Sequence, residues 1–281
     1  MKCFDILEIE KKIEIMDVGA ASINEIPPYK RLIDLGLANL NAFEGDKRQS
    51  KKLKDEYGTN LKLYEKFIFD GSEQNLYVCG TESGMTSVLK PNQNALNFFN
   101  GFNKIGKIEK IESVETKKLD DIEELPFIDL AKMDIQGAEL TVLKNGTKKL
   151  KDCLAVQLEV SYICLYEKQP TFGDIDLWMR SQGFVPHCFL DLKRWSITPT
   201  IFNNDFRTPG NQLLESDIVY VKDPLKFNLL NDEQLKKISI ISHYCFQSVD
   251  LSGFVFLELE KRGIIPKDSY KQYISNVKKF K

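Results

Sequence analysis

The sequence predicts an α/β protein built around a mostly parallel, doubly wound sheet. Over residues 13–69, apolar strand-like runs alternate with amphipathic helical segments, the rhythm of a parallel sheet with helices on both faces. The first run ends in a turn around Gly19, where the lack of a side chain lets the backbone approach a ligand. Late in the chain, two strand-like runs follow one another without a helix, as in an antiparallel hairpin.

The first part of this pattern is a β-α-β-α-β unit. Pro27-Pro28 suits the first turn of a helix, whereas Gly36 and Gly58 suit helix ends. The expected strands cover residues 13–18, 40–44 and 61–69, and the expected helices cover residues 29–35 and 46–57.

The rest of the chain is less regular. Residues 75–79 are expected to form an added strand. Residues 80–107 are rich in glycine, serine, asparagine and threonine and show little periodicity, which is typical of functional or mobile segments. Further strands are expected at 114–119, 127–133 and 154–160, a helical turn at 120–125, helices at 137–143 and 174–181, the hairpin strands at 184–190 and 213–221, and C-terminal helices from 232 onward.

The composition is that of an ordinary globular protein of 281 residues, 42% of them hydrophobic. The formal net charge is −2, so no overall basic field draws the chain to nucleic acid or anionic lipid. Its six cysteines are scattered without a CxxC pair, which argues against structural zinc and for a reducing compartment. No apolar run approaches the roughly 20 residues that span a bilayer, and no signal-peptide core is evident. We therefore expect a cytoplasmic protein without a membrane span.

Acidic residues lie at the ends of five predicted strands. They are Asp17, Glu44, Asp70, Asp134 and Glu159. Because the carboxyl ends of parallel strands share one edge of a sheet, we expect these side chains to gather along one rim. For any single one of them, a role in a turn or a helix cap is the simpler explanation. Together they predict a site for a cationic cofactor that carries ribose hydroxyls.

Four short motifs carry a family resemblance. They are Asp17-x-Gly19-Ala20, Phe43-Glu44, Lys132-x-Asp134-x-Gln136-Gly137-Ala138-Glu139 and Tyr166-x-x-Gln169-Pro170. Over roughly residues 13–222 the chain resembles the FkbM-type S-adenosylmethionine-dependent methyltransferases. The resemblance implies a Rossmann-like, doubly wound, mostly parallel seven-stranded sheet with an antiparallel edge strand. It also implies a methyltransferase domain over residues 1–222 and a C-terminal helical extension over residues 223–281.

The resemblance further implies how the cofactor is held. Asp17, Gly19 and Ala20 are expected to form the loop against the methionine moiety of S-adenosylmethionine, and Glu44 to bind the ribose hydroxyls. The chain departs from the family pattern directly afterwards. Residues 21–24, Ala-Ser-Ile-Asn, stand where Asn-x-Gly is usual, and this substitution leaves the shape of the loop open.

The remaining site residues concern the adenine and the chemistry. Asp70 resembles the acidic position beside the adenine, and Asp134 lies where related methyltransferases face the transferred methyl group. Transfer to a hydroxyl needs a nearby proton acceptor, a role that carboxylates and histidine can fill. The expected catalytic residues are therefore Asp134, Glu159 and His187. Packing is the simpler explanation for His187, and capping or a contact between elements is the simpler one for Glu139.

The expected reaction is O-methylation of a sugar, a glycan precursor or a secondary-metabolite hydroxyl by in-line displacement. We expect residues 80–106 and the C-terminal helices to select this small-molecule or glycan acceptor and to mediate a possible homo-oligomer. Trp195 either stacks on the acceptor or covers the sheet edge. Asp134 and Glu159 are suited to a divalent metal, but no recognisable ligand string accompanies them, so no metal site is predicted.

Other functions fit the motifs less well. A nicotinamide dehydrogenase normally has Gly-x-Gly-x-x-Gly, of which only Gly19 is present. No strand is followed by Gly-Lys-Ser/Thr, and Ser83 lies one place late for a serine-hydrolase elbow. The main alternative is a catalytically silent fold kept as a cofactor-gated binding or scaffold protein. The altered loop at residues 21–24 favours that alternative.

Overall fold

The computed structural model describes residues 6–20, 26–45, 47–80 and 83–278. The loop substitution at residues 21–24 lies outside the described residues. The described part of the chain forms a seven-stranded sheet, a separate three-stranded sheet and surrounding helices.

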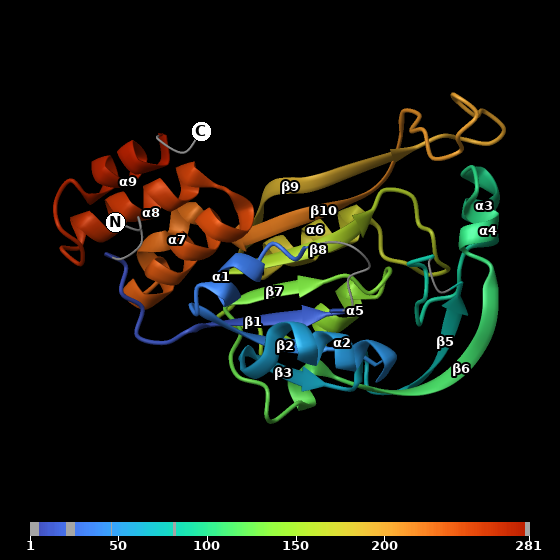
Figure 1. Cartoon of the computed structure of the whole chain (residues 1–281), viewed down its shortest axis with the longest axis horizontal. Helices are drawn as coiled ribbons and strands as arrows, with labels where there is room; N and C mark the ends of the chain where they lie inside the picture. The colour runs from blue at the N-terminus through green and yellow to red at the C-terminus, as the bar shows by residue number, and fades with distance from the viewer. Residues whose placement is uncertain (1–5, 21–25, 46, 81–82, 279–281) are drawn as a thin grey trace.

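The seven-stranded sheet has the strand order β3-β2-β1-β7-β8-β10-β9 (Figure 1). Its strands are β1 (Ile13–Val18), β2 (Ala38–Phe43), β3 (Leu61–Tyr64), β7 (Leu130–Met133), β8 (Ala155–Ser161), β9 (Phe184–Trp195) and β10 (Gln212–Lys222). All neighbours from β3 to β8 are parallel, whereas β10 is antiparallel to β8 and to β9. This arrangement confirms the Rossmann-like fold with an antiparallel hairpin at one edge.

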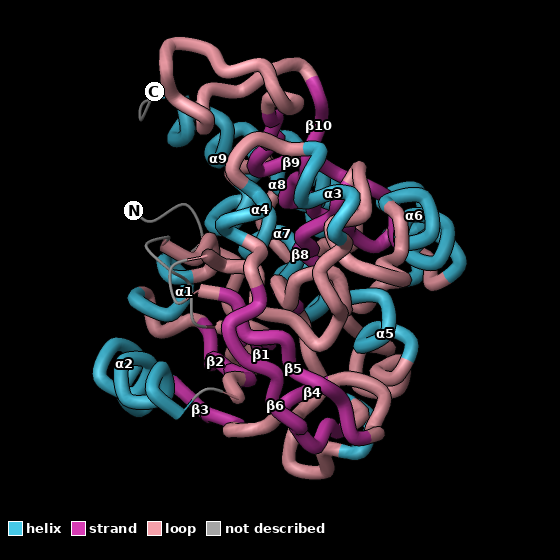
Figure 2. The backbone as a smooth tube through the Cα atoms, turned by 90° about the vertical axis from the view of Figure 1, so that its right-hand side faces the viewer, coloured by secondary structure: helices cyan, strands magenta, loops and turns pink. Residues whose placement is uncertain are grey.

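Helices cover both faces of this sheet (Figure 2). On one side lie α5 (Glu139–Lys144) and α6 (Phe172–Ser181), and on the other lie α1 (Lys30–Asp34) and α2 (Lys47–Tyr57). The C-terminal helices pack on the α1 side and are α7 (Asp232–Phe246), α8 (Val249–Lys261) and α9 (Ser269–Lys278). The sheet is thus doubly wound, as the alternating sequence pattern predicts.

The central strand β1 shows why the sequence folds in this way. Ile13 and Ile15 contribute to the hydrophobic cluster shared with α7, α8 and α9. Met16 and Val18 point to the opposite cluster, which includes side chains of α5 and α6. A strand that is apolar on both faces belongs in the interior of a parallel sheet, because helices remove both faces from water.

The second sheet corrects one sequence prediction. The single strand expected over residues 61–69 is wrong, because the chain leaves the large sheet after Tyr64 and pairs elsewhere. Lys66 forms an ion pair with Glu124 at 2.9 Å, so a charged surface contact interrupts the apolar run. The three strands of the second sheet, in spatial order, are β4 (Phe67–Ile68), β6 (Ile108–Lys117) and β5 (Glu73–Cys79).

The segment expected to be irregular, residues 80–107, contains two short helices in its described part. These are α3 (Gln93–Phe98) and α4 (Phe102–Ile105). They pack around Phe99 and Phe102 in a third hydrophobic cluster, which also includes Leu165 and Leu214 from beyond β8 and from β10. In Figure 1 the small sheet and these helices stand beyond the carboxyl ends of the parallel strands, where they add a wall at that edge.

Three short 3-10 turns connect these elements. They are η1 (Gly58–Asn60), η2 (Leu119–Asp121) and η3 (Pro224–Leu229).

The predicted boundary at residues 222 and 223 falls between β10 and η3. Because α7 to α9 share one hydrophobic cluster with β1, β2 and β10, they bury a face of the sheet. The division into two domains and self-association through these helices stay predictions. None of the helices in the described ranges is both long and apolar enough to cross a bilayer.

Candidate active site

A cleft of about 2340 Å³ lies between the carboxyl edge of the seven-stranded sheet and the small sheet. Its floor includes Gly19 after β1, Glu44 after β2, Asp134 after β7 and Glu159 on β8. The facing wall includes side chains of β5 and β6. The structure therefore brings together four of the predicted site residues, which lie far apart in the sequence.

The Gly19 turn is held close to the neighbouring strand β7. Gly19 has a φ of +81°, and its N–H donates to the carbonyl of Phe43 at 3.2 Å. The N–H of Asp134 donates to the carbonyl of Val18 at 3.1 Å. A Cβ on residue 19 would lie 2.1 Å from the Asp134 carbonyl oxygen. Only glycine fits this backbone crossing, and the absent side chain leaves the strand ends open to a ligand.

Asp17 lies beneath this turn rather than on the cleft surface. Its side chain is 1% exposed, and the Tyr29 hydroxyl donates to its Oδ2 at 2.5 Å. Its Oδ1 accepts no hydrogen bond from the described residues and lies 3.5 Å from Lys132 Nζ. Burial raises the pKa of Asp17, against the opposing effects of Lys132 and the Tyr29 hydroxyl. The carboxylate thus supports the turn from the α1 side.

The next residues of the predicted cofactor loop separate into two environments. Ala20 is buried in the core shared with α1 and α7 and does not line the cleft. Glu44 lies on the cleft surface, partly exposed, and its N–H donates to the Tyr64 carbonyl at 3.1 Å. That backbone bond anchors Glu44 between the carboxyl ends of β2 and β3, so its side chain begins at a fixed point on the floor.

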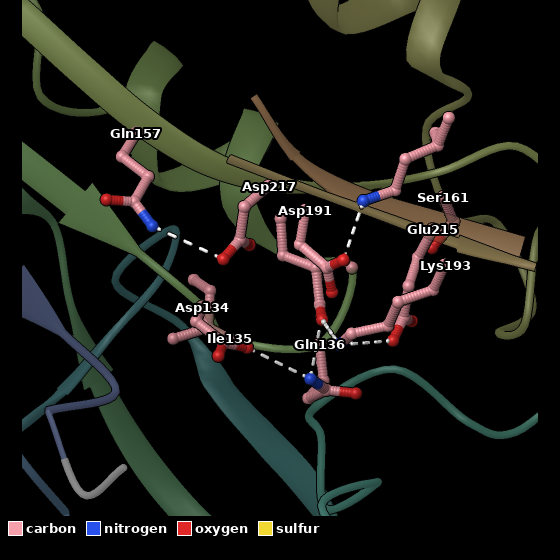
Figure 3. A network of polar contacts seen from close by, with 12 residues as sticks. Asp134, Ile135, Gln136, Gln157, Ser161, Asp191, Lys193, Glu215 and Asp217 are labelled. Atoms are coloured by element: carbon pink, nitrogen blue, oxygen red, sulfur yellow. Dashed lines mark hydrogen bonds and ion pairs between the residues drawn. The ribbon is translucent and has the colours of Figure 1, made fainter. Parts of the chain in front are cut away.

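Asp134 and Glu159 are joined by one amide. Gln136 Nε2 donates to Asp134 Oδ1 at 3.0 Å (Figure 3) and to Glu159 Oε2 at 2.7 Å. Burial, Asp134 and Glu215 raise the pKa of Glu159 well above its usual range, although Lys193 opposes them. Glu159 therefore binds a proton more readily than an exposed glutamate does, as a general base near neutral pH should.

Lys193, Glu215 and Asp217 of the antiparallel hairpin, which the motifs did not reveal, lie beside Glu159 and Gln157. We call Asp134, Glu159, Glu215, Asp217 and Lys193 the acidic network. Lys193 Nζ on β9 lies 2.9 Å from Glu215 Oε1 and 3.6 Å from Glu159 Oε1. On the next inward-facing position of β10, Asp217 Oδ2 accepts from Gln157 Nε2 at 3.3 Å. A signal for this arrangement exists in the sequence. Glu215 and Asp217 are acidic residues at i and i+2 of one strand, and such a pair shares one face.

Glu139 organises the loop that carries these residues. Its side chain is 1% exposed, and its Oε1 accepts from the N–H groups of Ile135 at 2.9 Å and Gly137 at 3.2 Å. Burial raises the pKa of Glu139 to about 7, although these backbone donors oppose the rise. Glu139 therefore holds the loop between β7 and α5 through the backbone N–H groups of that loop.

Replacing Glu139 with glutamine is expected to remove a pH-dependent part of the stability. Because the pKa of Glu139 rises from 4.5 to about 7 on folding, the unfolded chain releases this proton first as pH rises. The wild type therefore loses stability between about pH 4.5 and pH 7, by about 3 kcal/mol at about 1.36 kcal/mol per pKa unit. Urea unfolding at about pH 5 and pH 8 should show a smaller loss in Glu139→Gln, and equal losses would contradict this prediction.

Two predicted site residues, Asp70 and His187, lie outside the set of residues that line the cleft. Asp70 follows β4 of the small sheet, where its Oδ1 accepts from the Ser72 N–H at 2.9 Å, and it does not line the cleft. His187 on β9 likewise lies outside the cleft lining, with Nε2 2.7 Å from the Ser248 hydroxyl before α8. Asp70 lies away from the rim because β4, the strand before it, belongs to the small sheet. His187 packs against the C-terminal helices. Neither residue contacts the acidic network.

The described residues contain no group of three or more histidine, cysteine, aspartate or glutamate side chains placed to hold a metal ion. Asp134 and Glu159, the pair considered for a metal, instead share the amide of Gln136.

Solved structures resemble the chain only distantly. They include a proposed methyltransferase from Thermoplasma acidophilum, with 12% identity, a TM-score of 0.38 and coverage of 78% of this chain and 71% of that one. A precorrin-6y C5,15-methyltransferase from Geobacter metallireducens GS-15 shares 11% identity, with a TM-score of 0.37 and coverage of 79% and 85%. A magnesium protoporphyrin IX methyltransferase from Synechocystis PCC 6803 shares 11% identity, with a TM-score of 0.36 and coverage of 75% and 71%.

The family assignment rests on sequence instead. No significant match occurs among curated proteins. The family model of the methyltransferase FkbM domain matches residues 7–186, which is more than half of the 281-residue chain. The match includes the Gly19 turn, Glu44 and the Asp134 to Glu139 block, whose geometry is described above. This chain is a methyltransferase and belongs to the FkbM family.

Proposed function

We propose that the chain transfers a methyl group from S-adenosylmethionine to a hydroxyl of a sugar, a glycan precursor or a secondary metabolite. The observation that carries the proposal is the convergence of Gly19, Glu44, Asp134 and Glu159 on one cleft, at the carboxyl ends of four neighbouring strands. Ligands of open α/β sheets bind at this edge. The hydroxyl acceptor is inferred from the proton acceptor beside the predicted methyl position.

The residues present fit a cofactor of this kind. The bare Gly19 turn leaves room for a close approach of the amino acid moiety, and Glu44 offers carboxylate oxygens to ribose hydroxyls. Asp134 and Glu159 place negative charge where a sulfonium would lie, and opposite charges attract strongly in a partly desolvated cleft. Asp70 does not take part, so this proposal assigns no acidic partner to the adenine.

S-adenosylmethionine, when bound, supplies a methyl group already activated by its positively charged sulfur. The chain's own contribution is then orientation and proton transfer. Holding two reactants in line is worth about 7–11 kcal/mol of the barrier. Glu159, whose pKa is raised by burial and neighbouring carboxylates, would accept the proton of the acceptor hydroxyl. Met85, Phe102 and Trp195 line the cleft on the side of the hairpin and exclude water there.

Trp195 is fixed in this wall. Its indole N–H donates to the Asn100 carbonyl at 2.8 Å, and its ring meets Phe102 edge to face at 5.2 Å. Because Trp195 also lines the cleft, these contacts support both predicted roles, covering the sheet edge and presenting an aromatic surface to the acceptor.

Calorimetry with S-adenosylhomocysteine tests the proposal most directly. We expect binding at a single site, and an absence of binding would contradict the enzyme proposal. Binding without turnover on any acceptor would favour the catalytically silent scaffold. The acceptor itself can be found by incubating the protein with a radiolabelled methyl donor and fractionated small molecules and glycans from a lysate. We expect label in a hydroxyl-bearing fraction.

Asp134→Asn is expected to reduce turnover about 100-fold, the usual effect of removing one electrostatic contact at the reacting centre. The asparagine keeps an oxygen that accepts from Gln136 but lacks the charge, so affinity for S-adenosylhomocysteine, which has a neutral sulfur, should change little. Label transfer to the acceptor identified above and calorimetry measure the two effects. Equal losses in turnover and in affinity would indicate a structural role instead.

A further inference from the structure

Gln136 lies between the two carboxylates that face the cleft. Its Nε2 donates to Asp134 at 3.0 Å (Figure 3) and to Glu159 at 2.7 Å. A side-chain amide has two N–H donors, and both are used here. The amide oxygen must therefore point away from the two acidic groups, since the opposite orientation would set it against them.

One contact to the amide and two features of the Gln136 backbone hold this residue in place. The Tyr166 hydroxyl, which is buried, donates to Gln136 Oε1 at 2.8 Å. Ser87 Oγ, from the segment before α3, donates to the Gln136 backbone carbonyl at 2.8 Å. The backbone of Gln136 has a φ of +57°, a left-handed conformation that a residue with a side chain adopts only where its surroundings require it. Residues from separate parts of the chain thus fix the position of Gln136 and the orientation of its amide.

The surroundings of Glu159 explain why such a link is needed. Asp134 after β7, Glu215 on β10 and Glu139 at the start of α5 act against its negative charge, whereas Lys193 on β9 supports it. Burial, and after it the nearby charge of Glu159, raises the pKa of the Tyr166 hydroxyl well above its usual range. Hydrogen bonds to a carboxylate favour its charged form. Gln136 gives such a bond to both members of the pair.

We propose that Gln136 is a positioning residue that favours the ionised form of Glu159 and holds it beside Asp134, with one carboxyl group toward the methyl donor and the other toward the acceptor. This inference rests on the proposed function, because it assumes that the pair faces the sulfur of the cofactor. Tyr166 and Ser87 act through Gln136, and through Ser87 the segment before α3 becomes part of the same arrangement.

The test compares two ligands that differ only at the sulfur. S-adenosylmethionine carries a methyl group and a positive charge there, whereas S-adenosylhomocysteine is neutral, so the ratio of their dissociation constants reports the charge facing the sulfur. Calorimetry from about pH 5 to pH 9 should show the wild-type preference for S-adenosylmethionine growing as pH rises. In Gln136→Met, which keeps the volume and removes the donors, the midpoint should move up by about one pH unit.

Two further variants sharpen the test. Tyr166→Phe frees the amide to turn and should move the midpoint in the same direction by a smaller amount. Gln182→Met is the matched control, because Gln182 is exposed at the end of α6, and among the described residues its amide donates to the neighbouring Ser181 hydroxyl, at 3.1 Å. Its pH profile should equal that of the wild type.

The possible failures are distinguishable. If Gln136→Met weakens both ligands equally at every pH, Gln136 only supports the fold and the inference is overturned. If the wild type binds both ligands with a preference that does not change with pH, the inference fails and the donor site stands. If the wild type binds neither ligand, the proposed donor site fails and the inference fails with it.

Discussion

Gly19→Ala is expected to abolish binding of S-adenosylhomocysteine and to destabilise the fold by at least about 3 kcal/mol. The φ of +81° alone disfavours a side chain, and the added Cβ would meet the Asp134 carbonyl oxygen at 2.1 Å. Relieving that overlap requires the carboxyl ends of β1 and β7 to separate, which disturbs the floor of the cleft. Calorimetry and urea unfolding measure the two losses.

Gly36→Ala is the matched control for this experiment. Gly36 also has a positive φ, +72°, but nothing lies within 4 Å of the position a Cβ would take. The variant should therefore show only the conformational cost of the left-handed backbone, about 1–2 kcal/mol, with unchanged ligand binding. Equal effects of the two substitutions would show that the crossing between β1 and β7 is not as tight as described.

Glu44→Ala is expected to weaken S-adenosylhomocysteine binding about 10- to 100-fold. A hydrogen bond to a charged group contributes about 1.5–3 kcal/mol, and each 1.4 kcal/mol corresponds to about tenfold in affinity. Because the anchoring contact of Glu44 is made by its backbone N–H to the Tyr64 carbonyl, alanine keeps the local fold. Calorimetry at one pH and salt concentration is sufficient to measure the loss.

Glu65→Ala provides the comparison for this prediction. Glu65 lies just after β3, is exposed, and its Oε1 pairs with Lys54 at 3.3 Å. It carries the same charge near the same edge of the sheet but does not line the cleft. Its substitution should leave affinity unchanged. If Glu44→Ala also left affinity unchanged, the ribose role would be refuted.

Local sequence signals were sufficient for much of the fold. The apolar residues of β1 alternate between the two faces of the sheet, and a strand with this pattern folds in the interior in any such sheet. Gly36 and Gly58 mark real turns with positive φ. The small sheet was not predictable in the same way. The pairing of β4 with β6 joins residues 49 positions apart, such as Phe67 and Thr116, and hydrophobic periodicity within a segment does not identify a partner at that separation.

The candidate site likewise contains residues that the sequence reveals and residues that only the folded chain brings to it. Gly19, Glu44 and Asp134 are recognisable because each follows a strand end, and the order of parallel strands places such ends together. Lys193 and Glu215 reach the cleft through the hairpin register, which pairs Glu215 with Lys193 across the two strands. Whether a polar residue on those strands faces the cleft or solvent depends on a register that shifts at bulges.

By itself the sequence determined the class of fold, the family, and the residues that stand at the ends of the central strands, because these follow from local patterning and short motifs. Tertiary structure decided which of them meet. In the folded chain Asp17 lies beneath the turn, Asp70 lies next to the second sheet, and His187 lies beside the C-terminal helices. Gln136 joins Asp134 to Glu159. Such contacts depend on how distant segments pack, because a hydrogen bond forms only where both partners are brought within about 3 Å.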